Sequence, residues 1–243
     1  MLNDLELTGR ARTHVVQRDD LGAALHPDVI GPLLAMREAA AAEGIELAVY
    51  SGFRDFDAQC RIWNMKYRGE RPLYDERGNV RDSAGMSEDA LIGAILAWSA
   101  LPGASRHHWG SDIDVFDRAA LPPDYRVQLL PQEAEAGGVF ERLHQWLSAN
   151  IARFGFFRPY REFRGGVYPE PWHLSYAPVA TAALALLNED LIAAALRDVD
   201  LLGKPAVLAR LPDFYRDHIV NVDDAAARRV LASYDGGRGA GPA

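Results

Sequence analysis

Residues 105–114 read Ser-Arg-His-His-Trp-Gly-Ser-Asp-Ile-Asp, and residues 170–173, much further along the chain, read Glu-Pro-Trp-His. The two segments offer histidines and carboxylates, which are side chains that bind divalent transition metals. A catalytic zinc site needs three protein ligands, one open position for water and a base that does not bind the metal. If the two segments meet in space, they predict a metallohydrolase.

The spacing within the first segment requires a turn. His107 and Asp114 are seven residues apart, and on a continuous strand this odd offset would point them to opposite faces. They can converge only if the chain turns between them, and Gly110 has the conformational freedom to do so. Asp112 and Asp114 share a strand face, so on spacing alone either carboxylate could reach a metal.

The second segment is predicted to be extended. Pro171 makes a helix interior unfavourable, because proline lacks the backbone N–H that a helix uses. Glu170 should then lie at the mouth of a strand, with His173 inside it.

The hydrophobic pattern around both segments predicts an α+β protein. Helices are expected over residues 27–43, 55–65, 87–100, 138–154 and 181–199, and strands over residues 45–51, 112–117, 156–160, 166–168 and 172–176. A long loop is expected over 67–85, and one or two further helices over 200–235. Helices at both ends with strands between them favour α+β over a repeating βαβ pattern.

This order of elements predicts one catalytic domain over residues 1–178. A helical C-terminal extension over 179–235 should pack on that domain. The glycine-rich residues 236–243 are expected to be a disordered tail.

Composition narrows the class of protein. The chain has 243 residues, of which 49% are hydrophobic and 25% charged, so one sizeable core is feasible. A net charge of −8 argues against nucleic acid as the main partner. The single cysteine, Cys60, excludes an internal disulfide. The sequence does not indicate an oligomeric state.

No apolar run approaches the roughly 18–20 residues of a membrane span. The acidic N-terminus does not resemble a signal peptide, so the chain as it stands is expected to be cytoplasmic. If an export segment is missing, action in the periplasm or cell wall is expected instead.

Three motifs carry a resemblance to a known family. The pattern S-x-H-x-x-G-x-x-x-D, followed later by E-x-W-H, resembles the zinc D-alanyl-D-alanine carboxypeptidases of the VanY/M15 type. Ser51-Gly52-Phe53-Arg54, with Gln59 behind it, resembles an upstream segment of the same family. The similarity runs from about residue 28 to residue 178 in the family's order. It implies a small central antiparallel sheet flanked by helices, as in hedgehog and D-Ala-D-Ala peptidase folds.

The resemblance also implies roles for individual residues. The zinc ligands would be His107, Asp114 and His173. Glu170 would be the catalytic base, and Arg54 would bind the substrate's terminal carboxylate. Ser105 and Gln59 would help to shape the substrate pocket.

One residue departs from the family pattern. Asp112 stands where the family usually has a small residue, so it is expected either to orient a metal ligand or to contact a substrate amine. His108 is expected in the pocket or behind the ligands rather than on the metal.

The implied activity is hydrolysis of the terminal D-Ala-D-Ala bond of peptidoglycan stem peptides, by metal-activated water with a glutamate base. Related families offer alternatives: L,D-carboxypeptidases, D,D-dipeptidases and endolysin-type endopeptidases. The predicted loop 67–85 should line the cleft and distinguish among them. A non-catalytic zinc-binding module is a further alternative, because hedgehog signalling domains have a related fold. The presence of both Glu170 and Arg54 argues against it.

Overall fold

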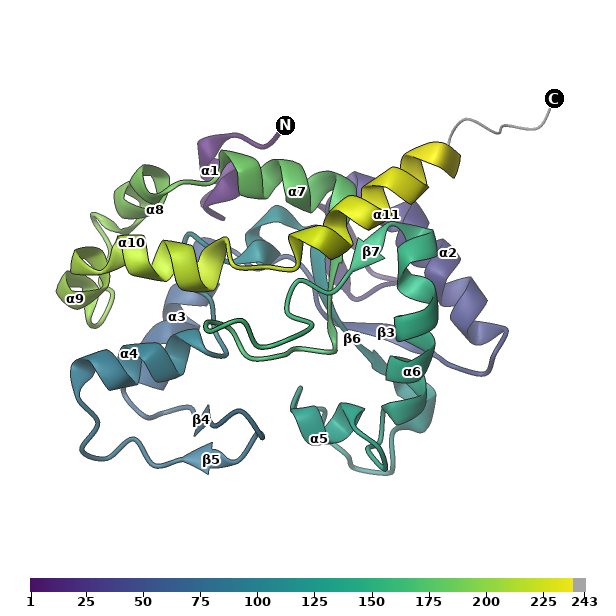
Figure 1. Ribbon diagram of the computed structural model, residues 1–243, viewed down its shortest axis with the longest axis horizontal. Helices are drawn as coiled ribbons and strands as arrows, with labels where there is room; N and C mark the ends of the chain where they lie inside the picture. Colours follow the sequence, from purple (N-terminus) through teal and green to yellow (C-terminus); the bar gives the residue numbers. More distant parts are fainter. Residues whose placement is uncertain (238–243) are drawn as a thin grey trace.

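A four-stranded antiparallel sheet occupies the centre of the computed structural model, which describes residues 1–237 (Figure 1). Its strands lie in the order β3-β6-β8-β7, where β3 is Leu47–Ser51, β6 is Asp112–Asp117, β8 is His173–Tyr176 and β7 is Phe156–Phe157. The predicted strands at 112–117, 45–51 and 172–176 are therefore confirmed, and so is the α+β class with a small antiparallel sheet.

The strand β6 forms because its residues alternate between a buried apolar face and a polar face. Ile113 and Val115 are fully buried and share a hydrophobic core with Leu174 of β8. Asp112 and Asp114 must then lie on the other face of the sheet. Asp114 is directly opposite His173 in the β6–β8 register, so two predicted ligands are neighbours across one strand pair.

Two helices cover the apolar face of the sheet. They are α2, Pro27–Ala41, and α6, Glu141–Asn150. From α2, Val29, Leu33 and Met36 are fully buried in the same core as Ile113 and Val115. Full burial of such a side chain contributes about 1.5–3 kcal/mol, so this face holds the sheet in place.

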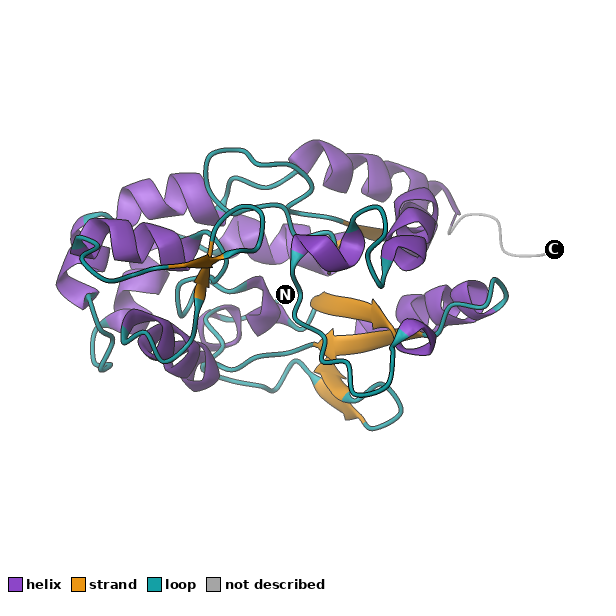
Figure 2. Ribbon diagram, turned by 90° about the horizontal axis from the view of Figure 1, so that it is seen from below, coloured by secondary structure: helices purple, strands orange, loops and turns teal. Residues whose placement is uncertain are grey.

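A second hydrophobic core lies beside the sheet and is built from helices (Figure 2). It combines α3, Phe56–Tyr67, and α4, Glu88–Leu96, with α7, Ala177–Leu186, and α8, Glu189–Leu196. Trp63 of α3 is fully buried and donates a hydrogen bond from Nε1 to the Leu202 carbonyl at 3.0 Å. Residues after 178 therefore share a core with residues before it.

The remaining elements are short, apart from the last helix. They are α1 Asp4–Leu7, β1 Val16–Arg18, β2 Ala23–Leu25, β4 Leu73–Tyr74, β5 Val80–Arg81, α5 Pro131–Ala134, α9 Lys204–Ala209, α10 Leu211–Phe214 and α11 Asp224–Gly237. Short 3-10 helices cover Arg106–Trp109, Arg118–Ala120 and Ile151–Phe154, and a π-helical turn covers Tyr215–Ile219. The helix α11 runs beside α7 and β7 (Figure 1).

The structure differs from the sequence prediction in several elements. The single helix expected over 181–199 is two helices, because Asn188 caps α8 by accepting the Leu191 N–H at 3.0 Å. The strand expected over 166–168 is wrong: the Tyr168 N–H bonds to the Ala97 carbonyl instead of a neighbouring strand. The loop expected over 67–85 contains the small hairpin β4–β5.

The predicted tail is only partly described. The helix α11 continues to Gly237, two residues into the segment expected to be disordered, and positions 238–243 lie outside the described residues. Within residues 1–237, no single helix meets the length and apolarity of a membrane span. The helices α7 and α8 meet those criteria only as a pair, bent by 79° between them.

Gly110 makes the predicted turn between His107 and Asp114. Its φ of +65° lies in the left-handed region that glycine adopts without strain. An added Cβ would lie 2.5 Å from Val15 Cγ1 and 2.8 Å from the backbone nitrogen of His26. Both the dihedral angle and the close approach of the β2–α2 connection therefore require glycine here.

We expect Gly110→Ala to lower the free energy of unfolding by about 1–3 kcal/mol, because it adds backbone strain and steric overlap. Urea denaturation of the metal-free protein measures this. Gly69→Ala is the matched control: its φ is +74°, but a Cβ added there would have no neighbour within 4 Å. An equal loss in both variants would show that the close approach at Gly110 contributes nothing.

Candidate active site

Three side chains able to bind a metal meet above the polar face of the sheet. The ligand atoms of His107, Asp114 and His173 all lie within 4.8 Å of one another, and all three residues are buried. His107 Nε2 is 3.4 Å from Asp114 Oδ2, and His173 Nδ1 is 3.5 Å from Asp114 Oδ1. The structure thus brings together the three residues that the sequence resemblance gave as ligands.

Local backbone geometry explains this convergence. His107 lies on the 3-10 helix Arg106–Trp109, which ends at the left-handed Gly110. The chain then enters β6, which carries Asp114 opposite His173. The odd spacing between His107 and Asp114 is therefore resolved by the turn that the sequence required.

Each histidine has one nitrogen hydrogen-bonded away from Asp114 and the other nitrogen near Asp114, and in His173 this second nitrogen also contacts Glu170. His107 Nδ1 is 2.9 Å from the Gly52 carbonyl, to which it can only donate, so its Nε2 is left with a free lone pair. His173 Nε2 is 3.0 Å from the Asp112 carboxylate, which leaves Nδ1 on the side of Asp114.

The donor set fits a tetrahedral metal. Two ligand atoms about 2.0–2.1 Å from a tetrahedral ion lie roughly 3.3 Å apart. Asp114 Oδ2 lies 3.4 Å from His107 Nε2 and Asp114 Oδ1 lies 3.5 Å from His173 Nδ1, so each oxygen of this carboxylate is close to that spacing from one histidine. Two imidazoles and one carboxylate supply three ligands and leave a fourth position open.

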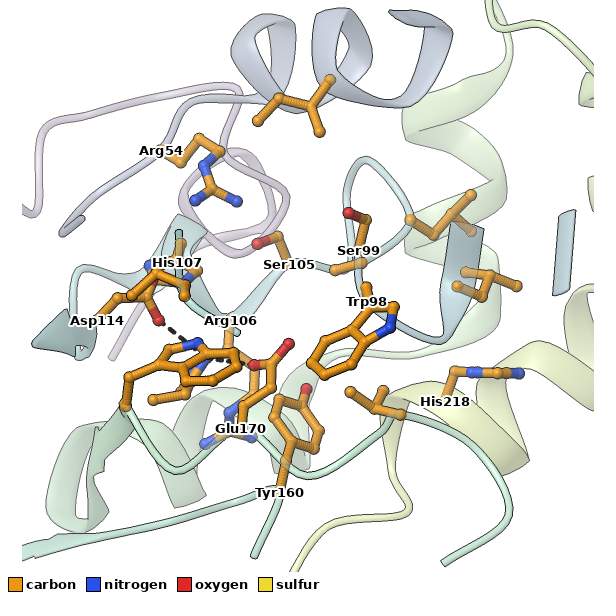
Figure 3. A pocket seen from close by; sticks show the side chains of 18 of the residues that line it. Arg54, Trp98, Ser99, Ser105, Arg106, His107, Asp114, Tyr160, Glu170 and His218 are labelled. Atoms are coloured by element: carbon orange, nitrogen blue, oxygen red, sulfur yellow. Dashed lines mark hydrogen bonds and ion pairs between the residues drawn. The ribbon is translucent and has the colours of Figure 1, made fainter. Parts of the chain in front are cut away.

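A cavity of about 280 Å³ opens onto these side chains. Its lining includes the three ligand-type residues together with Glu170 and Arg54. Figure 3 shows the side chains of Arg54, His107, Asp114 and Glu170 around this one cavity. Glu170 Oε2 is 3.1 Å from His173 Nδ1, and Glu170 stands just before β8, as its position before a strand predicted.

Arg54 follows β3 and is held in place by two side chains. Its Nη1 donates to Gln59 Oε1 at 2.9 Å and its Nη2 donates to Ser51 Oγ at 3.0 Å. Gln59 is fully buried, is absent from the cavity lining, and donates to the Ala100 carbonyl. Gln59 therefore shapes the pocket through Arg54, without a surface of its own in the cavity.

Ser105 lines the cavity. Ser105 is 1% exposed, and its hydroxyl is buried and has no hydrogen-bond partner within residues 1–237. A buried hydroxyl is normally paired, so this group is available to a molecule in the cavity.

His108 and Asp112 lie outside the cavity lining, and both are fully buried. His108 Nδ1 is 2.6 Å from the Arg54 carbonyl, and its Nε2 accepts the Gly103 N–H at 3.1 Å. His108 therefore supports the Arg54 backbone. Neither residue offers a surface for the substrate contact suggested by the sequence, because protein groups surround both side chains.

In the metal-free site, the pKa values of the two histidines shift in opposite directions. Burial lowers the pKa of His107 well below its usual range, and the nearby Arg54 adds to this. Burial would also lower the pKa of His173, but its hydrogen bonds to Asp112 and Glu170 outweigh burial and raise the pKa to about 10. Burial raises the pKa of Asp114 to about 6. A metal must therefore displace the Nδ1 proton of His173.

Two cationic side chains of the cavity were missed by sequence reasoning. Lys66 and Arg71 line it together with Arg54. Burial lowers the pKa of Lys66 to about 8, and its Nζ donates to Ser99 Oγ at 2.6 Å. Lys66 lies in the last turn of α3. Arg71 lies in the following segment, within the loop 67–85 that the sequence predicts to line the cleft.

Arg106 was also overlooked, although it lies within the first motif. It is 3% exposed and pairs with Asp112 at 2.8 Å. Burial would raise the pKa of Asp112, but Arg106 and His173 hold that pKa below its usual range. The sequence signal for this ion pair was that Arg106 stands six residues before Asp112, the aspartate that departs from the family pattern.

The sequence is similar to a known protein family and to several known proteins. A family model described as VanY, D-alanyl-D-alanine carboxypeptidase, matches residues 22–179. An uncharacterised protein of Haemophilus influenzae is 34% identical over 137 residues, which cover all of that protein and 56% of this chain. A D-alanyl-D-alanine carboxypeptidase of Enterococcus faecalis is 27% identical over 151 residues, which cover 60% of this chain and 45% of that protein.

Solved structures agree in fold. A structure of VanYB in complex with D-alanine-D-alanine is 25% identical, with a TM-score of 0.50 over 72% of this chain and 82% of that one. The LdcB LD-carboxypeptidase is 22% identical, with a TM-score of 0.50 over 80% of this chain and 82% of that one, and shows the fold alone. Because the family model covers well over half of the sequence, the chain belongs to the VanY family of D-alanyl-D-alanine carboxypeptidases and is a peptidase.

Proposed function

We propose that this chain is a zinc-dependent carboxypeptidase that hydrolyses the terminal D-Ala-D-Ala bond of peptidoglycan stem peptides. The observation that carries the proposal is the shared cavity: Arg54 lines it together with Glu170 and the three ligand-type residues. The similar VanYB structure, which is in complex with D-alanine-D-alanine, supports the choice of substrate.

Zinc would be held by His107 Nε2, an oxygen of Asp114 and His173 Nδ1. Two nitrogens and one oxygen form a donor set typical of catalytic zinc sites. When bound, zinc supplies an activated water and polarises the scissile carbonyl.

Glu170 handles the proton in this scheme. It lines the cavity, and its Oε2 lies 3.1 Å from His173 Nδ1, so the carboxylate is beside the metal position without belonging to the three-ligand group. A carboxylate placed there accepts the proton of the attacking water and passes it to the leaving amine. The products are a shortened peptide and free D-alanine.

Arg54 would select substrates with a free C-terminus. A guanidinium binds a carboxylate with two parallel hydrogen bonds, and here Ser51 and Gln59 hold it in one orientation. The cationic Lys66 and Arg71 nearby make the same cavity wall favourable for an anionic peptide.

We expect Arg54→Lys to lower kcat/KM on a free pentapeptide by about tenfold or more, because lysine keeps the charge but loses the bidentate contact. Loss of a hydrogen bond to a charged group costs about 1.5–3 kcal/mol. The measurement compares the free peptide with its C-terminal amide. Equal losses on both peptides would show that Arg54 does not recognise the carboxylate.

The proposal is tested by incubating the zinc-loaded protein with tri-, tetra- and pentapeptide stems and identifying the products by mass. Release of one D-alanine from the pentapeptide alone is expected. Release of D-alanine from the tetrapeptide would indicate an L,D-carboxypeptidase, and release of a dipeptide would indicate a D,D-dipeptidase. Absence of any product, with zinc bound, would refute the proposed activity.

A further inference from the structure

Asp112 makes contacts that the family pattern does not explain. It is fully buried, and its carboxylate oxygens accept three hydrogen bonds or ion-pair contacts. Oδ1 lies 2.8 Å from Arg106 Nε and 3.0 Å from His173 Nε2, and Oδ2 accepts the Ser111 hydroxyl at 2.7 Å. All of its partners are protein groups, and one of them is a metal-ligand candidate.

Arg106 holds this carboxylate in place by bonding to residues of two strands, Asp112 of β6 and Ser175 of β8. Its Nη2 donates to Ser175 Oγ at 2.7 Å, and Ser175 lies directly opposite Asp112 in the β6–β8 register. The guanidinium is 4.9 Å from the ring centroid of Trp109 and is almost fully buried. Arg106 therefore fixes the position of Asp112 and neutralises its charge within the sheet.

The position of Asp112 determines which nitrogen of His173 can face the metal. A carboxylate only accepts hydrogen bonds, so the His173 Nε2 next to it must carry a hydrogen. The nitrogen left to bind a metal is Nδ1, which lies 3.5 Å from Asp114 Oδ1. Asp112 and Asp114 share one strand face but contact opposite nitrogens of one imidazole.

We propose that Asp112, clamped by Arg106, is a positioning residue that fixes the His173 ring with Nδ1 toward the metal. This inference rests on the zinc site of the proposed function. Such an outer carboxylate sets the tautomer of a ligating histidine and strengthens it as a donor. Asp112 thus contributes to metal affinity without touching metal or substrate.

The first test measures zinc affinity by competition with a chelator. We expect Asp112→Asn, which keeps the shape and removes the charge, to bind zinc about 10–100-fold more weakly than the wild type. Asp117→Asn is the matched control, because Asp117 is a buried carboxylate at the end of the same strand that accepts the backbone N–H groups of Glu46 and Ala119. It should bind zinc with wild-type affinity. Unchanged affinity in Asp112→Asn, or an equal loss in Asp117→Asn, would overturn the inference.

A second test needs no variant. Long-range ¹H–¹⁵N spectra of the zinc-loaded wild type, labelled at histidine, should show His173 with a hydrogen on Nε2 and the metal on Nδ1. Metal on Nε2 would overturn the inference even if the protein cleaves peptides. The expected signature in a protein that cleaves no stem peptide would refute the proposed activity and leave the role of Asp112 intact.

Discussion

Replacing Glu170 with Gln is expected to lower kcat by about 10²–10⁴-fold while the zinc content stays at the wild-type level. Glutamine keeps the shape of the side chain but cannot accept the proton of the attacking water. Glu170 lines the cavity and lies outside the three-ligand group, so the metal should remain. Turnover of a pentapeptide stem and elemental analysis for zinc measure the two quantities on one preparation.

The matched control for this variant is Glu162→Gln. Glu162 is exposed and lies in the same loop, so the change removes an identical charge away from the cavity lining. It should leave kcat unchanged. Normal turnover in Glu170→Gln would exclude Glu170 as the base, and loss of zinc from that variant would identify it as a ligand instead.

Replacing His173 with Ala is expected to have the largest effect on the metal. The variant keeps only His107 and Asp114 as ligands, so zinc affinity should fall by more than the about 10–100-fold that loss of an outer partner costs. Hydrolysis should be lost with the metal. Zinc per folded protein, with folding monitored by circular dichroism, is the measurement.

His144→Ala controls for the loss of a buried histidine. His144 lies on α6, is 6% exposed compared with 4% for His173, and is absent from the three-ligand group. It should keep its zinc. Full zinc occupancy in His173→Ala would remove His173 from the ligand set, whatever the activity of the variant.

Local chemistry made much of the fold predictable. The alternating residues 112–117 form β6 over the predicted range, and Ser87 caps α4 by accepting the Ala90 N–H. Gly110 makes the turn that the spacing of His107 and Asp114 required. Each of these features depends on residues close together in sequence, which is why the pattern was sufficient.

Features that depend on distant packing were not predictable. Leu187, at the end of the apolar run, is buried in the second core against residues far away in sequence, although the Asn188 cap that begins α8 is a local signal. The segment 166–168 has strand-like residues, but its backbone bonds to the end of α4. The N-terminal hairpin β1–β2 was likewise missed.

The sequence by itself determined the family, the α+β class and the residues that can serve as metal ligands, because these depend on residue types in a fixed order. Only the tertiary structure decided what Asp112, the other aspartate on that strand face, contacts. Spacing places Asp112 and Asp114 on one face of β6, but pairing with β8 sets Asp114 opposite His173 and Asp112 opposite Ser175. Arg106 then holds Asp112 behind the His173 ring while it also bonds to Ser175, a residue 69 positions further along the chain.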